Sequence, residues 1–198
     1  MMIFGGFKMS SIERDKAVEL FKKYNDEYSL FKHALSVEAV MRYFARKNGE
    51  DEEEWGMIGL LHDMDYEKYP DEHCFKVKEI LEKEGLPDSF IRAIQSHGYG
   101  ICTDIEPLSN MEKTLYAVDE LSGFITACAL VRPSKSLEDM EVKSVKKKLK
   151  DKAFAAKVDR TVINKGAEML GINIDELIKE TIEALIPIQE SIGLNKIS

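Results

Sequence analysis

Histidine is scarce in this chain, which contains only His33, His62, His73 and His97, and each falls on the apolar face of the helix predicted around it. Four imidazoles would then point inward from four separate helices. Imidazoles that converge in a core repel one another when protonated, and their ring nitrogens lack hydrogen-bond donors when neutral. Binding to a shared metal ion removes both difficulties. One such histidine alone is usually a surface or core residue, but the four together predict a metal site.

Two aspartates extend this set of metal-binding side chains. Asp63 directly follows His62, and Asp119 lies inside the apolar run Leu115-Tyr-Ala-Val-Asp119 of a long predicted helix. An ionised carboxylate on an apolar helix face is costly unless it is paired or ligated, and no lysine or arginine stands close to Asp119 in that helix. Both carboxylates are therefore candidate metal ligands.

The order of these residues resembles the HD superfamily of metal-dependent phosphohydrolases. His33 stands in FKHALSVEAV, the His62–Asp63 dyad in GLLHDMDYEKYP, and Asp119 in MEKTLYAVDELSGF. The resemblance covers about residues 26–131. It implies an all-α, single-domain helical bundle in which these four side chains hold a catalytic metal ion.

The resemblance extends to the members of this superfamily that bind two metals, because His73 and His97 lie between the dyad and Asp119. In that case Asp63 would bridge the two ions; in a one-metal enzyme His97 would contact substrate phosphate instead. Imidazole and carboxylate ligands suit Mn, Fe, Co, Ni or Zn better than Mg alone. The implied activity is hydrolysis of a phosphomonoester, phosphodiester or phosphoanhydride, with a nucleotide as substrate and a metal-activated water as nucleophile.

Two acidic residues after the dyad are candidates for acid–base catalysis. Asp65 or Glu67 could orient the nucleophilic water or protonate the leaving group, although turn-forming acids in a solvated loop fit the same pattern. The usual glycine or lysine just after the dyad of many HD hydrolases is absent. Glu120 lies about 100° around the helix from Asp119, so we expect it to face away from the site.

Three basic residues could contact substrate phosphate. Lys68 follows the dyad, and Arg132 and Lys135 follow the predicted Asp119 helix. Residues 132–152 carry eight Lys/Arg and four Asp/Glu, a local charge of +4 on a chain of net charge -8. This segment could steer an anionic substrate, although a basic run is more often the solvated face of a helix.

The elements that must position these residues are all predicted to be helices, because no segment alternates with a period of two. Ser10 with Glu13 forms a capping-box signature and Asn110 is the expected cap of the Asp119 helix. We expect an N-terminal segment and helix at 1–25, a catalytic core at 26–131 and C-terminal helices at 132–198, packed on the core or forming a homodimer interface. The helices are predicted at about 10–24, 26–47, 51–64, 70–85, 87–97, 110–131, 136–150, 154–170 and 173–192.

Composition limits the classes of partner and compartment. The three cysteines form no Cys-x-x-Cys pair, which argues against a disulfide framework or a zinc ribbon, and no apolar run approaches the roughly 20 residues of a membrane span. We therefore expect a cytoplasmic protein acting on a small phosphorylated molecule, with nucleic acid and membrane disfavoured. Two other classes stay open: an HD-type di-iron oxygenase, which would use the same six ligands, and a non-catalytic module that senses nucleotides.

Overall fold

A computed structural model describes residues 12–197, and every regular element within that range is a helix. The all-α prediction is therefore confirmed. None of these helices is long and apolar enough to cross a membrane. The α-helices are α1 (Arg14–Tyr24), α2 (Tyr28–Asn48), α3 (Glu52–Leu61), α4 (Lys76–Lys83), α5 (Asp88–Ser96), α6 (Asn110–Leu130), α7 (Val142–Leu149), α8 (Arg160–Leu170) and α9 (Ile174–Leu185), with short 3-10 turns η1 (Pro70–Glu72) and η2 (Ile186–Ile188).

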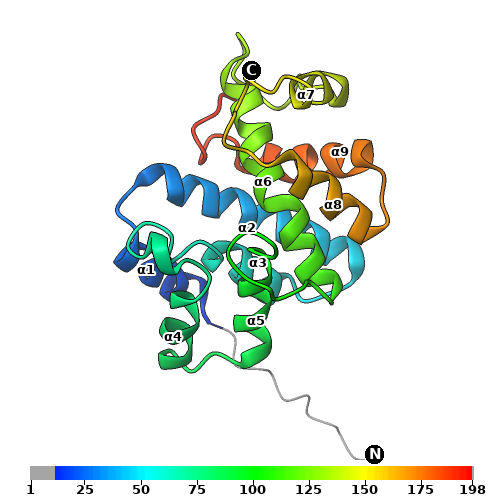
Figure 1. Ribbon diagram of the computed structural model, residues 1–198. Coiled ribbons are helices and arrows are strands. Elements are labelled where there is room, and N and C mark those ends of the chain that lie inside the picture. Colours follow the sequence, from blue (N-terminus) through cyan, green and yellow to red (C-terminus); the bar gives the residue numbers. More distant parts are fainter. Residues whose placement is uncertain (1–11, 198) are drawn as a thin grey trace, which may run out of the picture.

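The two longest helices, α2 and α6, form the centre of the bundle. Figure 1 shows α6 running through the middle of the molecule, with α7, α8 and α9 on one side of it and α1 and α4 on the other. Helix α2 packs against both α3 and α6, and α8 packs against α6. The side chains that α6 buries include Leu115, Val118, Leu121 and Ile125, which recur every three or four residues and fill the core between these layers.

Helix α6 begins at a capping box made by Ser109 and Glu112. The Ser109 hydroxyl accepts the backbone N–H of Glu112, and the Glu112 carboxylate accepts the N–H of Ser109 in return. The cap is thus one residue earlier than Asn110, the expected cap. The capping box expected at Ser10 lies outside the described residues, and Glu13, at the start of α1, makes no side-chain capping bond.

Gly59 sets the close approach of α3 to α2. A Cβ at this position would lie 2.9 Å from the carbonyl oxygen of Val37 on α2, so only glycine permits the observed spacing without a shift of backbone. Asp51 caps the start of α3 by accepting two backbone N–H groups, and α3 ends at Leu61. The His62–Asp63 dyad therefore leaves the end of α3 directly beside α2.

Several predicted helices are shorter than expected because side chains hold irregular turns in their place. The helix predicted at 136–150 begins only at Val142, since Asp139 binds Arg132 and accepts the Ser134 hydroxyl in the preceding loop. The helix predicted at 154–170 begins at Arg160, whose guanidinium binds four backbone carbonyls of the loop before it. The division of the chain at residues 25 and 131 stays a prediction.

The helix predicted at 70–85 is also broken. It consists of the turn η1, three irregular residues from His73 to Phe75, and then α4. Cys74 adopts a left-handed backbone with φ of 68°, which is uncommon for a residue that carries a Cβ. His73 consequently projects from a turn and not from a helix face.

Candidate metal centre

Four of the predicted ligands, which we call the first ligand group, converge where α2, α3 and α6 meet. His33 lies inside α2, Asp119 inside α6, and His62 and Asp63 follow the last residue of α3. One ligand atom from each lies within 4.8 Å of the others. Nε2 of His33 is 2.9 Å from Oδ1 of Asp119, and Nε2 of His62 is 3.3 Å from that oxygen and from Oδ2 of Asp63.

His73, Cys74 and His97 form a second ligand group beside the first, and their ligand atoms also lie within 4.8 Å of one another. Nε2 of His73 and Nε2 of His97 are 3.2 Å apart, and Oδ1 of Asp63 lies 3.5 Å from the former and 3.4 Å from the latter. Asp63 thus stands between the groups, with Oδ2 toward the first and Oδ1 toward the second. A carboxylate in this position would be shared by two cations if each ligand group bound one.

Three of the four imidazoles are held by their Nδ1 atoms. In each case Nδ1 lies 2.5–2.8 Å from an oxygen that can only accept a hydrogen bond, so Nδ1 carries the proton and Nε2 presents a lone pair in the neutral ring. Metal-ligating histidines are oriented in this way by their outer nitrogen. The pairs are His62 with the carbonyl of Gly59, His73 with the carboxylate of Asp65, and His97 with the carbonyl of Ile94.

The surroundings of the His62 imidazole indicate that a cation fits between these ligands. Its Nε2 atom is completely buried and has no hydrogen-bond partner within the described part of the chain, although two carboxylate oxygens lie 3.3 Å away. Burial alone would lower the pKa of His62, but the charges of Asp63 and Asp119 outweigh burial and raise it well above its usual value. The centre therefore requires positive charge, either as protons or as a bound metal ion.

The spacing of the ligand atoms also suits a metal ion. Ligand atoms about 2.1 Å from a shared ion at tetrahedral angles stand about 3.4 Å apart. The distances among Nε2 of His73, Nε2 of His97 and the neighbouring Oδ1 of Asp63 are 3.2, 3.4 and 3.5 Å. The donor set of imidazole, carboxylate and thiol favours divalent transition metals over Mg.

Both ligand groups open onto one cleft of about 360 Å³. Its walls beyond the ligands are largely apolar, and Tyr66, 49% exposed, stands at its margin with its ring edge-on to His73. No lysine or arginine lines this cleft among residues 12–197. The apolar wall residues are Leu30, Ile101, Val158 and Val162.

Asp65 and Glu67, the two carboxylates expected to act as acid or base, form hydrogen bonds within the protein outside the cleft. Asp65 is completely buried, and its oxygens accept hydrogen bonds from Nδ1 of His73 and from the backbone N–H of Val77. Glu67 accepts the backbone N–H groups of Asp26 and Glu27 just before α2, and does not line the cleft. The structure therefore gives both residues positions different from the expected catalytic ones.

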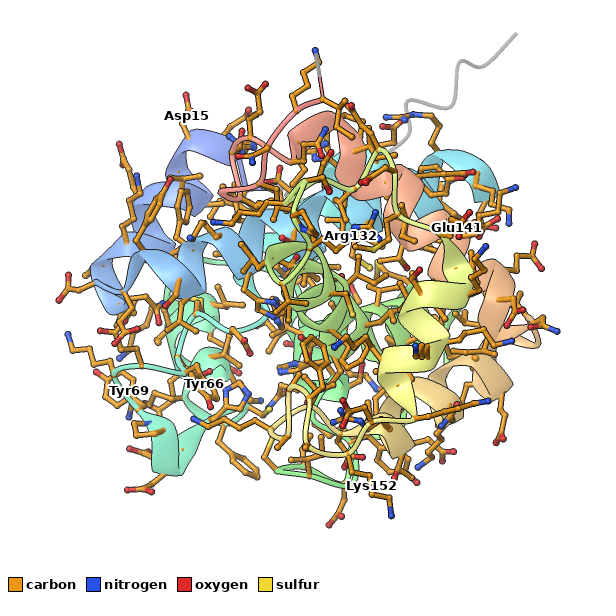
Figure 2. The ribbon with its side chains drawn as sticks, turned by 90° about the horizontal axis from the view of Figure 1, so that it is seen from above. Asp15, Tyr66, Tyr69, Arg132, Glu141 and Lys152 are labelled. Atoms are coloured by element: carbon orange, nitrogen blue, oxygen red, sulfur yellow. The ribbon has the colours of Figure 1, made fainter. Side chains whose placement is uncertain are left out.

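The three basic residues expected to contact phosphate do not line the cleft either. The Lys68 ammonium lies over the ring of Tyr24, and Arg132 pairs with Asp139. Lys135 sits at a turn where its carbonyl accepts the N–H of Asn195. Figure 2 shows Arg132 well separated from Tyr66, which marks the cleft margin.

Glu120 lines the cleft, contrary to the expectation that it faces away from the site. The cleft extends far enough around α6 that Asp119, Glu120 and Gly123 all line it, so a turn of 100° does not take Glu120 away from the site. Burial and the neighbouring charge of Asp119 raise the pKa of Glu120 to about 7. Gly123, one turn later on α6, also lines the cleft, and a Cβ at this position would meet only the His33 ring, at 3.8 Å.

Residues 30–123 match the sequence model of the HD domain. This segment is an HD domain. The HD domain runs from α2 into α6 and contains all six predicted histidine and aspartate ligands, so the resemblance seen in the sequence is confirmed. HD domains form a superfamily of metal-dependent hydrolases. No curated protein and no solved structure matches the chain.

Proposed function

We propose that the HD domain of this chain hydrolyses a phosphate ester in the cleft, using two divalent transition-metal ions. The first ligand group would hold one ion, and His73 and His97 with the other oxygen of Asp63 would hold the second. The observation that carries the proposal is the position of Asp63, whose two oxygens face separate sets of Nε2 atoms. Divalent ions bound in this way neutralise phosphate oxygens and lower the pKa of a bound water to about 7.

The protein itself would orient the metal-binding imidazoles and supply a group for proton transfer. Asp65 and the carbonyl oxygens of Gly59 and Ile94 fix three imidazole rings, so that little rearrangement is needed when ligands engage. Glu120 is the one carboxylate of the described cleft lining outside both ligand groups. Its side chain is placed to exchange a proton with a water or a leaving group in the cleft.

The cleft favours a substrate that carries a single phosphate. Polyphosphates are usually held by lysine and arginine side chains, and none of these lines the cleft in residues 12–197. The apolar wall and the exposed ring of Tyr66 suit an organic group with a flat face. A nucleoside monophosphate or a cyclic nucleotide is the substrate class that fits both features.

The test is a hydrolysis screen of the full chain loaded in turn with Mn, Co, Ni, Fe and Zn. Phosphomonoesters, phosphodiesters and nucleoside mono-, di- and triphosphates would be compared for the wild type and for Asp63→Ala. We expect metal-dependent hydrolysis of a monophosphate or diester by the wild type alone. Equal metal content and equal activity in the two proteins would overturn the proposal.

A second candidate function is oxidation of a neutral substrate by a di-iron centre. The absence of cationic side chains from the described cleft lining favours it, since a neutral substrate would need none. Iron-loaded protein would then consume oxygen in the presence of a reductant and release no phosphate from any ester in the screen. Hydrolysis in the zinc-loaded protein, with no oxygen uptake in the iron-loaded protein, would exclude this candidate.

A further inference from the structure

We infer that Cys74 supplies a sulfur ligand to the cation that His73 and His97 hold. The second position would then be a mixed sulfur, nitrogen and oxygen site that selects a thiophilic ion such as Zn, Co or Fe over Mn or Mg. This inference rests on the proposed metal centre and adds to its ligand set. Neither the HD match nor the sequence pattern assigns any role to a cysteine.

The Cys74 sulfur atom lies beside the imidazole of His97. Sγ of Cys74 lies 3.9 Å from Nε2 of His97, and the Cys74 side chain is completely buried. A sulfur 2.3 Å and a nitrogen 2.1 Å from one ion stand about 3.6 Å apart at tetrahedral angles, so a small movement would bring both into a common coordination sphere. The ligand atoms of His73, Cys74 and His97 already lie within 4.8 Å of one another.

The backbone around Cys74 is held in an unfavourable conformation that aims the side chain at the centre. Its φ of 68° is rare for a residue with a Cβ, and such residues concentrate at functional sites. The carbonyl oxygen of Cys74 accepts a buried hydrogen bond from the Gln95 side chain at 2.8 Å. Gln95 belongs to α5, two residues before His97, so one helix end fixes both Cys74 and the imidazole beside it.

Gly98 provides a second, independent sign that sulfur belongs at this place. A Cβ on Gly98 would overlap the sulfur atoms of both Cys74 and Cys102. The residue after His97 must therefore lack a side chain for the two sulfurs to stand beside the second ligand group. Cys102 lines the cleft, and its thiol donates a hydrogen bond to the carbonyl oxygen of Gly98 at 3.8 Å, so it stands close to the proposed ligand.

Cys128 offers a matched control within the same chain. It is buried on α6 like an ordinary apolar side chain and belongs to neither ligand group. Replacing Cys128 by serine removes a buried thiol without touching the metal centre. Any loss specific to Cys74 is then separated from the general effect of burying a hydroxyl group.

The experiment uses the full chain, stripped of metal with a chelator and titrated with Co²⁺ while the absorption spectrum is recorded. Cobalt bound to a thiolate shows a charge-transfer band in the near ultraviolet. We expect that band in the wild type, in Cys128→Ser and in Cys102→Ser, and its loss in Cys74→Ser and Cys74→Ala. We also expect at least a tenfold weaker affinity for Zn²⁺ at the second position in both Cys74 variants.

The outcomes separate this inference from the proposed function. Two equivalents of bound cobalt without a charge-transfer band would overturn the sulfur ligand and leave the metal centre intact. No bound cobalt at all would overturn both. A band that survives in Cys74→Ser and Cys74→Ala would also overturn the inference, as would its loss only in Cys102→Ser. Circular dichroism of each metal-free variant checks that the helical fold is retained.

Discussion

The two ligand groups of the metal centre are supported by different kinds of structure. In the first group, His33 and Asp119 project from the interiors of α2 and α6, the two long helices at the centre of the core. In the second group, His73 and Cys74 lie in a turn, and His97 follows the end of α5. The packing of these two long helices therefore fixes half of the first group, His33 and Asp119, whereas the whole second group depends on individual hydrogen bonds.

This difference predicts how each group responds to mutation. A helix interior loses its position only when the packing of the whole helix changes, which costs much of the stability of the fold. A turn can lose its geometry when one supporting contact is removed, such as the bond from His73 to Asp65 or from Gln95 to the Cys74 carbonyl. We therefore expect the second position to be the weaker and more easily lost of the two.

The largest effect is expected at Asp63, which joins the two groups. Asp63→Ala should abolish binding of both cations and lower kcat/KM by roughly a thousandfold or more, since metal catalysis supplies several kcal/mol. Metal analysis by mass spectrometry and the hydrolysis assay check this together. The His73→Ala variant, by contrast, should lose only one of the two equivalents of bound metal. Equal losses of metal in the two variants would show that the groups do not differ.

Glu120→Gln should lower kcat by on the order of a hundredfold while both cations stay bound, because it removes a proton-exchanging carboxylate outside the ligand groups. The change keeps the size of the side chain. Steady-state kinetics and metal analysis of the same preparation are the measurements. A variant that loses metal in proportion to its activity would place Glu120 among the supports of the first group instead.

Asp65→Asn should weaken the affinity of the second position by about 10–100-fold and leave the first unchanged. The amide cannot accept both the His73 ring and the Val77 N–H as the carboxylate does. Glu67→Gln is the control, since Glu67 is an acid of the same loop that contacts no ligand. Competition of Zn²⁺ with a chelating dye would resolve the two affinities. If Asp65→Asn instead weakened the tighter of the two Zn²⁺ affinities, Asp65 would not be a support of the second position.

The smallest effect is expected at Glu112, which links α6 of the first group to Arg92 on α5 of the second. Burial alone would raise the pKa of Glu112, but the backbone N–H groups of Ser109 and Leu108 and the Arg92 guanidinium lower it below the usual value. The stabilisation is thus present above the unfolded-state pKa of about 4.3 and is lost as the pH falls through the lower folded-state pKa.

Glu112→Gln should accordingly lower the free energy of unfolding by about 1 kcal/mol at neutral pH. The difference from the wild type should shrink as the solution becomes more acidic than the usual carboxyl range. Urea unfolding of the metal-free proteins at several pH values measures this. A difference that stays constant with pH would show that the charge of Glu112 does not contribute.

The central helices were predictable because their signals are local. Helix α2 was expected at 26–47 and is found at Tyr28–Asn48, and α6 was expected at 110–131 and is found at Asn110–Leu130. Both have long apolar stripes and clear end signals. The starts of α7 and α8 were missed because Arg132 and Arg160 hold the preceding loops through contacts that no sequence window reveals.

Only the part of the candidate site that lies on long helices was predictable from the sequence. Polar side chains on apolar helix faces indicated His33 and Asp119, and the structure brings them together. The left-handed turn at Cys74, the burial of Asp65 and the width of the cleft at Glu120 depend on tertiary contacts. These features belong mostly to the second ligand group, whose supports are single hydrogen bonds between distant segments.

Anomalous diffraction from crystals of the full chain grown with zinc, recorded just above the zinc absorption edge, tests the two-cation centre directly. The account predicts two peaks on either side of the Asp63 carboxylate, one among His33, His62 and Asp119 and one beside His73 and His97, with zinc–nitrogen distances of about 2.0–2.1 Å. A single peak at the first group would contradict the bridging role of Asp63, and the absence of any peak at these side chains would contradict the metal centre itself.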